Sequence, residues 1–177
     1  ARVHALAASH DLLSSKQWKG VAIADLIGAQ LAHFDELIGR RIVIEGPDVR
    51  LSSAGAQVIG MIVHELATNA VKHGALSNQT GHVALSWTIN AAASGDRFFI
   101  DWTERDGPEV MPPTQRGYGS TVITSMAELN LDGAVSLDYA PAGLAWRLDC
   151  PVTFVTEVDP LTGEWYRPAA TNHMSRP

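Results

Sequence analysis

The run HELATNAVKHGALS, residues 64–77, constrains this chain more than any other segment. At about 100° per residue, Glu65, Asn69 and Lys72 fall within roughly 60° of one another on one face of a helix. An apolar stripe occupies another face of the same helix and consists of Ile59, Ile62, Leu66 and Ala70. One face therefore packs, while the other presents a carboxylate and a carboxamide one turn apart, which suits a metal-bound nucleotide.

A His-Glu pair on a helix also begins the zinc-protease motif, which requires a second histidine four residues after the first. Position 68 is Thr68, so that motif is excluded. An amphipathic helix whose polar face meets water is the other alternative, because a Glu-x-x-x-Asn pair by itself does not separate the two. The choice depends on the motifs that follow.

Two further motifs come later in the chain. Residues 98–104, FFIDWTE, are rich in aromatic and β-branched residues and predict a strand that ends at the acidic turn 106–108. Strand periodicity places Trp102 and Glu104 on one face. Residues 117–120, GYGS, then precede an apolar helical pattern, and glycines before a helix N-terminus let backbone N–H groups approach a phosphate.

Together these motifs resemble the catalytic, ATP-binding domains of sensor histidine kinases, in the subgroup named for a His in the N box and a Trp-x-Glu in the G1 box. Residues 64–77 are similar to the N box, residues 102–108 to the G1 box and residues 117–120 to the G2 box. The ending from Leu131 to Pro151 resembles the family's final hairpin. The resemblance covers residues 1–152.

The resemblance implies ATP and Mg²⁺ as cofactors and gives each motif a role. Asn69 would bind Mg²⁺ through its amide oxygen, a hard neutral ligand suited to an octahedral ion that already carries phosphate oxygens. Glu65 would orient or deprotonate the attacking group or hold a metal-bound water, and His64 is the second catalytic candidate. The expected phosphate-binding residues are Lys72, His73, Gly117, Gly119, Ser120 and Thr121.

For two of these roles, the adenine-binding acid and the role of His64, the sequence leaves an alternative open. Glu104 or Asp106 would accept a hydrogen bond from the adenine amino group, with Glu104 favoured, and Gly107 would let the ring approach. His64 points about 100° away from Glu65, so a structural histidine bonded to a neighbouring loop is as good a hypothesis as a catalytic one. Trp102 is expected in the core, because large aromatic side chains dominate sheet packing.

The composition limits the kinds of partner that the chain can bind and indicates its cellular compartment. A length of 177 residues with 46% hydrophobic content suits one domain with an extra helix or tail. The net charge of −6 argues against nucleic acid or an acidic membrane surface, which need clustered Lys and Arg. The single Cys150 excludes an intrachain disulfide and fits a reducing compartment. With no apolar run of membrane-spanning length and no signal sequence, we expect a cytoplasmic fragment that does not contact membrane.

The order of elements predicts a two-layer α/β sandwich, with a mixed, mostly antiparallel sheet covered by three main helices on one face. The resemblance implies the same fold, the Bergerat-type ATP-binding fold, with a lid at residues 109–116. We expect a helix marked by apolar residues from Leu26 to Phe34, with Asp25 in its first turn and Gly39 after its end. Further helices are expected at 54–73, with Ser53 as N-cap, and at 119–129, and strands at 41–45, 49–51, 82–90, 97–104, 134–139 and 145–150. Residues 1–19 would be a remnant of the dimerisation and phosphoacceptor helices, residues 20–154 the catalytic domain, and residues 155–177 a tail that is draped over the domain or disordered.

No His-Arg-x-x-Asn-like acceptor context occurs in these residues. The resemblance therefore implies transfer of the ATP γ-phosphoryl group to a histidine outside this fragment, in the dimerisation domain of a homodimeric parent, and then to a response regulator. An ATPase or an anti-sigma-factor-like serine kinase of the same superfamily would share Glu65 and Asn69 but not the Trp102-x-Glu104 pair. A non-catalytic nucleotide-binding module would bind ATP without transfer.

Overall fold

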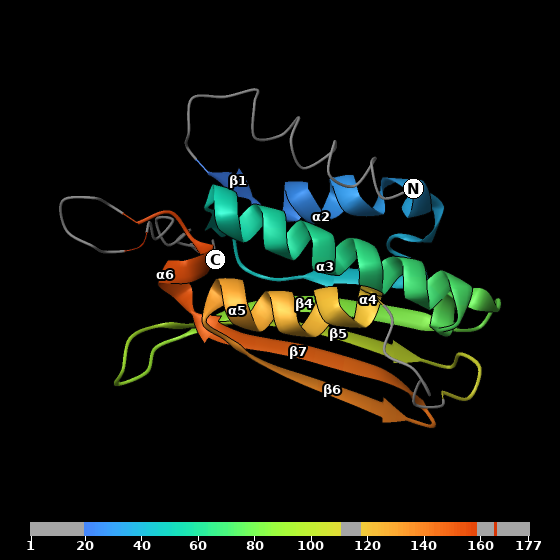
Figure 1. Cartoon of the computed structure of the whole chain (residues 1–177). Helices are drawn as coiled ribbons and strands as arrows, with labels where there is room; N and C mark the ends of the chain where they lie inside the picture. Colours follow the sequence, from blue (N-terminus) through green and yellow to red (C-terminus); the bar gives the residue numbers. More distant parts are fainter. Residues whose placement is uncertain (1–19, 111–117, 159–164, 166–177) are drawn as a thin grey trace, which may run out of the picture.

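A five-stranded sheet in the order β2-β4-β5-β7-β6 forms one layer of the protein (Figure 1). The computed structural model describes residues 20–110, 118–158 and 165. β2 runs parallel to β4, and the other neighbouring strands are antiparallel. The strands are β2 (Ile42–Glu45), β4 (His82–Asn90), β5 (Arg97–Arg105), β6 (Ala134–Ala140) and β7 (Gly143–Pro151).

Helices cover one face of this sheet, as Figure 1 shows. They are α2 (Ile23–Leu31), the 3-10 segment η1 (Ala32–Leu37), α3 (Ser53–Lys72), the 3-10 turn η2 (Ala75–Ser77), α4 (Tyr118–Thr121), the π segment η3 (Val122–Met126), α5 (Ala127–Leu131) and α6 (Val152–Val155). Two short strands, β1 (Val21–Ala22) and β3 (Arg50–Leu51), pair with each other. The predicted two-layer sandwich is confirmed, whereas the expected helix in residues 1–19 and most of the lid lie outside the described residues.

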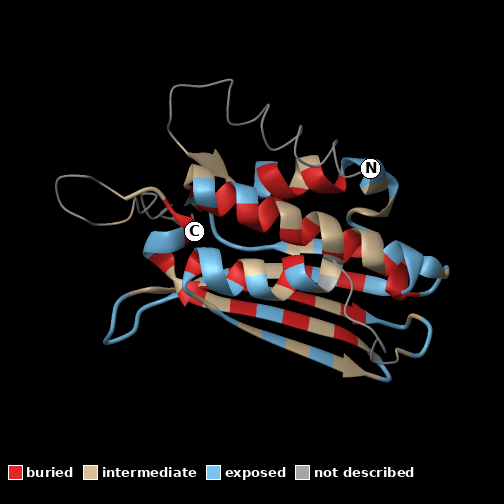
Figure 2. Cartoon of the chain, in the orientation of Figure 1, coloured by how far each residue is buried: buried red, intermediate tan, exposed pale blue. Residues whose placement is uncertain are grey.

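Figure 2 shows buried residues alternating with less buried ones along the strands, as expected when one face of the sheet packs against the helices. In β5, Phe98, Ile100 and Trp102 are fully buried, and Trp102 lies opposite Trp146 of β7. Burying each large apolar side chain stabilises the fold by about 1.5–3 kcal/mol. The prediction that Trp102 is a core residue is confirmed. Glu104 continues the same row and is 3% exposed, so a carboxylate occupies a core position.

The long helix α3 begins one residue earlier than predicted. Its N-cap is Ser52 rather than Ser53, and the Ser52 side chain accepts a hydrogen bond from the Gly55 backbone N–H at 3.1 Å. The prediction was wrong because two adjacent serines offer the same cap, and only the extended backbone at Ser52 aims its oxygen at the helix. A β-carbon on Gly55 would lie 2.3 Å from the Val155 carbonyl oxygen, so α6 packs directly on this end.

The helical stretch that begins at Tyr118 is not the uniform α-helix that the sequence predicts. It changes from α4 to the π segment η3 and back to α5, and it ends at Asp132 in the left-handed conformation. The π segment shifts the phase, so that Ile123, Ala127 and Leu131 are buried while Leu129 is 84% exposed. The apolar helical pattern expected after residues 117–120 included Leu129 as a core-facing residue, and this expectation was wrong.

The described residues beyond 154 pack against the domain. Val155 and Thr156 are buried, and Thr156 forms a β-bridge with Leu51. Trp165 forms a bridge with Val158 and donates its indole N–H to Asp96 at 2.8 Å. The domain limits stay a prediction, and these contacts agree with the alternative in which the tail is draped over the domain.

Candidate functional site

Two motifs that are far apart in the sequence meet beside helix α3. Glu65 and Asn69 lie one turn apart on α3 and are half-buried. The position that a β-carbon would take on Gly119 of α4 is 2.8 Å from Glu65 Oε2 and 3.8 Å from Asn69 Nδ2. Any side chain at position 119 would enter the space of the acid and the amide. The carboxylate, the carboxamide and the glycine backbone therefore border one site.

Glu104 reaches the same region from the sheet. Its Oε2 accepts a hydrogen bond from the Ala75 backbone N–H at 2.7 Å, and its Oε1 accepts one from the Trp102 indole N–H at 3.0 Å. Burial raises the pKa of Glu104, while the bonds from Ala75 and Trp102 act in the opposite direction. The end of β5 is thereby joined to the turn that follows α3.

Glycines allow these backbones to touch. A β-carbon on Gly74 would lie 2.1 Å from Glu104 Oε2, and one on Gly107 would lie 2.6 Å from the Ala75 Cα. Neither position has room for a side chain without moving Glu104 or the backbone. The turn after α3 and the end of β5 therefore pack on each other directly.

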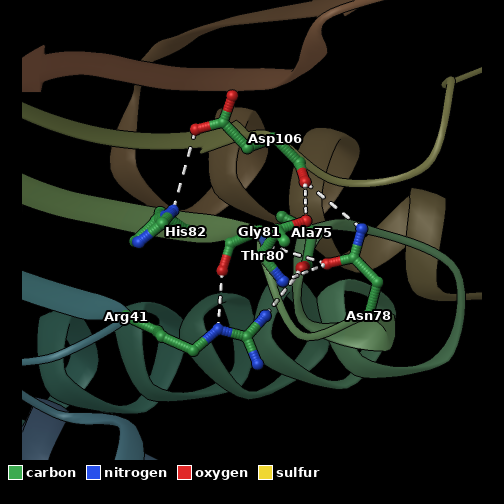
Figure 3. Close-up of polar contacts among 7 residues, drawn as sticks. All are labelled: Arg41, Ala75, Asn78, Thr80, Gly81, His82 and Asp106. Atoms are coloured by element: carbon green, nitrogen blue, oxygen red, sulfur yellow. Dashed lines mark hydrogen bonds and ion pairs between the residues drawn. The ribbon is translucent and has the colours of Figure 1, made fainter.

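Asp106 points away from this junction. It has a left-handed backbone conformation with φ of 57°, and its carboxylate lies 3.7 Å from His82 Nδ1, as an ion pair when that histidine is protonated (Figure 3). His82 is exposed and precedes Val83, the buried residue that lies opposite Glu104 in the sheet. Successive side chains of β4 point to opposite faces, so His82 points away from the face of Val83 and Glu104. The Asp106 carboxylate beside His82 therefore lies on the other side of the sheet from Glu104.

The other predicted site residues differ in their exposure to solvent. Lys72 and His73 are exposed at the C-terminal end of α3, and Thr121 is exposed on α4. His64 is half-buried, and burial lowers the pKa of its imidazole, which favours the neutral form. Gly117 and the side chain of Ser120 lie outside the described residues.

Sequence reasoning missed the backbone partners of the site. Ala75 has no functional side chain, yet its N–H binds Glu104 and its carbonyl accepts a bond from Arg41. The Trp102–Glu104 hydrogen bond could have been anticipated, since residues i and i+2 of a strand share a face. Among the described residues no cluster of three or more His, Cys, Asp or Glu side chains could hold a metal ion.

Comparisons with known proteins identify the family of this chain. The family model described as HWE histidine kinase matches residues 1–48. The blue-light-activated histidine kinase of Brucella ovis is 34% identical over 152 residues, which is 86% of this chain and 31% of that protein. The corresponding protein of Brucella anthropi is 36% identical over the same shares. The chain carries an HWE histidine kinase catalytic domain. It spans 31% of the length of these curated relatives.

Solved structures share the fold of this kinase domain. The histidine kinase domain of the Erythrobacter litoralis EL346 blue-light-activated kinase superposes with a TM-score of 0.62 at 20% identity, covering 86% of this chain and 78% of that chain. The nucleotide-free catalytic domain of the histidine kinase ThkA gives a TM-score of 0.55 at 14% identity, covering 77% and 97%. In the described part of the chain, no helix is both long and apolar enough to cross a membrane.

We predict that Glu104→Gln destabilises the kinase domain by about 1–3 kcal/mol, because an amide presents one acceptor oxygen to two buried donors. Urea unfolding at pH 7 measures this loss. The matched control is Trp102→Phe, which removes one of the donors. In the Trp102→Phe background, Glu104→Gln should lower the free energy of unfolding clearly less than it does in the wild type. An equal loss in both backgrounds would contradict the role of the indole.

The pH dependence of this effect has a defined sign. Because burial raises the pKa of Glu104, the folded state binds its proton more tightly than the unfolded state. The resulting stabilisation is fully present below the ordinary glutamate pKa of about 4.3 and is lost as pH rises through the raised folded value. The unfolding free energy of the wild type minus that of Glu104→Gln should therefore be larger at pH 5 than at pH 8. The opposite trend would contradict the direction of the shift.

Proposed function

We propose that this kinase domain binds Mg-ATP between α3, α4 and the end of β5 and transfers the γ-phosphoryl group to a histidine on the dimerisation region of the same protein. The approach of Gly119 to Glu65 and Asn69 carries the proposal, since it joins a glycine backbone suited to phosphates with an acid and an amide suited to a metal. A response regulator would then receive the phosphoryl group, and the parent would act as a homodimer.

Glu104 is the acid that we assign to adenine. It lies on the helix-covered face, whereas the Asp106 carboxylate lies beside His82 on the other face. An ionised carboxylate has about four acceptor positions, and the protein donors occupy two of them. The remaining positions allow Glu104 to accept a bond from the exocyclic amine, while Ala75 and Trp102 hold the group in place.

We assign the triphosphate and the metal to α3 and α4. Asn69 would hold Mg²⁺ through Oδ1, and the ion would neutralise phosphate charge when bound. The lack of a side chain on Gly119 leaves room for a phosphate beside Asn69. Lys72 and His73, at the exposed end of α3, are the candidate cations. Gly117, Ser120 and Thr121 keep their predicted role in cradling the phosphates.

Glu65 is the catalytic candidate that the geometry supports best. It lies one turn before Asn69, close to where the γ-phosphate would be, so it can orient the acceptor imidazole or accept its proton. His64 is half-buried, and burial lowers its pKa and so disfavours the charged imidazolium. We assign it to shaping α3 beside Glu65 rather than to supplying charge.

Asn69→Ala should weaken Mg-ATP binding ten- to a hundredfold, which is about 1.4–2.8 kcal/mol, because a metal ligand is lost while the fold is kept. Calorimetric titration with and without Mg²⁺ measures the effect. Gln57→Ala is the matched control, since Gln57 is an exposed amide on the same helix. Magnesium-dependent affinity that is unchanged in Asn69→Ala would exclude Asn69 as the ligand.

Gly119→Ala should separate function from stability. The new methyl group meets the end of the Glu65 side chain, so the affinity for Mg-ATP should fall about tenfold or more. The free energy of unfolding should be unchanged or slightly higher, because glycine in a helix is unfavourable by about 0.5–1 kcal/mol. Gly28→Ala in α2 is the control, since nothing lies within 4 Å of its added β-carbon. Equal Mg-ATP affinity in the wild type and Gly119→Ala would remove Gly119 from the site.

The proposed reaction is tested by adding a separate fragment that bears the family's acceptor histidine. With γ-labelled ATP, that fragment should acquire acid-labile, base-stable phosphate, and Glu65→Gln should slow the transfer by about 10²–10⁴-fold. The kinase chain alone should remain unlabelled, because the γ-phosphate needs its nucleophile in line at near-contact distance. ATP binding without transfer would favour a nucleotide-binding module, and phosphate release without labelling would favour an ATPase.

A further inference from the structure

Arg41 makes two hydrogen bonds to backbone carbonyls near the candidate adenine site, although it lies in a different part of the sequence. It is half-buried and directly precedes β2. Its Nε donates to the Gly81 carbonyl oxygen at 2.7 Å, and one terminal nitrogen donates to the Ala75 carbonyl oxygen at 3.1 Å (Figure 3). The Arg41 carbonyl accepts a bond from the Val83 N–H at 2.8 Å. Both its backbone and its guanidinium are thus fixed to the segment around the start of β4.

Ala75 connects this arginine to Glu104. Its carbonyl accepts the bond from Arg41, and its N–H donates to Glu104 Oε2 at 2.7 Å. The position of one alanine backbone therefore depends on Arg41 and at the same time sets the position of the buried carboxylate. Glu104 has its other oxygen held by Trp102 at 3.0 Å, so a shift of Ala75 would rotate the carboxylate about that contact.

The surroundings give Ala75 little freedom. A β-carbon on Gly81 would lie 1.9 Å from the Ala75 carbonyl oxygen, and one on Gly107 would lie 2.6 Å from its Cα. The guanidinium bridges Ala75 and Gly81 at this close approach of two backbones. A planar arginine fork can donate to both carbonyls at once, which a lysine ammonium does less well because its donors are not held in one plane.

The loop between α3 and β4 is also held from its other side. Asn78 Nδ2 and Thr80 Oγ1 donate to the Asp106 carbonyl at 3.2 and 3.0 Å, and Asn78 Oδ1 accepts from the Gly81 N–H at 2.7 Å (Figure 3). The loop is therefore tied to the end of β5 independently of Arg41. Removing the guanidinium should free the Ala75 carbonyl without releasing the whole loop.

We propose that Arg41 is a positioning residue for base selection, which fixes the Ala75 backbone so that Glu104 is aimed at the exocyclic amine of adenine. The inference rests on the proposed adenine role of Glu104. Adenine offers a donor at this position, whereas guanine offers a carbonyl that a carboxylate repels. A correctly aimed Glu104 therefore favours ATP over GTP, and a rotated one discriminates less.

The test measures the dissociation constants of Mg-ATP and Mg-GTP for the full 177-residue chain. Arg41→Gln should lower the preference for ATP about tenfold, mainly through weaker ATP binding, and Arg41→Lys should lower it by a smaller factor. Arg40→Gln removes the same charge from the exposed neighbouring residue and should leave the preference unchanged. Arg41→Lys decides the question if Arg41→Gln does not fold.

A double-mutant cycle separates positioning through Glu104 from a general loss of structure. Glu104→Gln should itself lower the preference for ATP, and adding Arg41→Gln to it should lower the preference no further. Additive losses would overturn the proposal, as would an unchanged preference in both Arg41 variants while Glu104→Gln lowers it. If Glu104→Gln keeps the full preference, the adenine role of Glu104 is wrong and the proposal for Arg41 fails with it, while phosphotransfer by the domain is judged separately by the acceptor-fragment experiment.

Discussion

The buried carboxylate of Glu104 is the interaction on which the rest of the site depends. It occupies a core position in β5 and is satisfied by one backbone N–H from the turn after α3 and one indole N–H from its own strand. A buried charged group without such partners would cost several kcal/mol, so the helix layer and the sheet must keep this register to remain stable. The same contacts that satisfy the charge also place it where α3 ends.

The site also depends on the close approach of backbone segments at positions that have no side chain. Gly74, Gly81 and Gly107 surround Ala75 so closely that a side chain at any of them would displace a carboxylate or a neighbouring backbone. Gly119 has the corresponding relation to Glu65 and Asn69. These glycines let chain segments from the helices and from the sheet touch, and in an HWE histidine kinase domain that is the region proposed to receive the nucleotide.

The residues proposed to bind the phosphates and the residue proposed to bind the base lie on different layers of the fold. Helix α3 presents Glu65 and Asn69 to the proposed phosphates, and β5 presents Glu104 to the proposed base. Arg41 belongs to neither motif, but it reaches the turn between them through two carbonyls. In the proposed site, base recognition and phosphate recognition depend on different contacts, so we expect that a substitution on one side can change nucleotide preference without removing the chemistry on the other.

The sequence by itself determined the fold class, most element limits and the face of α3 that carries Glu65 and Asn69, because these follow from local periodicity. It did not determine the cap at Ser52, the π segment that exposes Leu129, or the packing of Val155 and Thr156, since each depends on a partner distant in the chain. The choice between Glu104 and Asp106 was also left open by spacing alone. Only the tertiary structure put the two carboxylates on opposite faces of the sheet, because the left-handed turn at Asp106 directs its side chain to His82 while the strand directs Glu104 to Ala75.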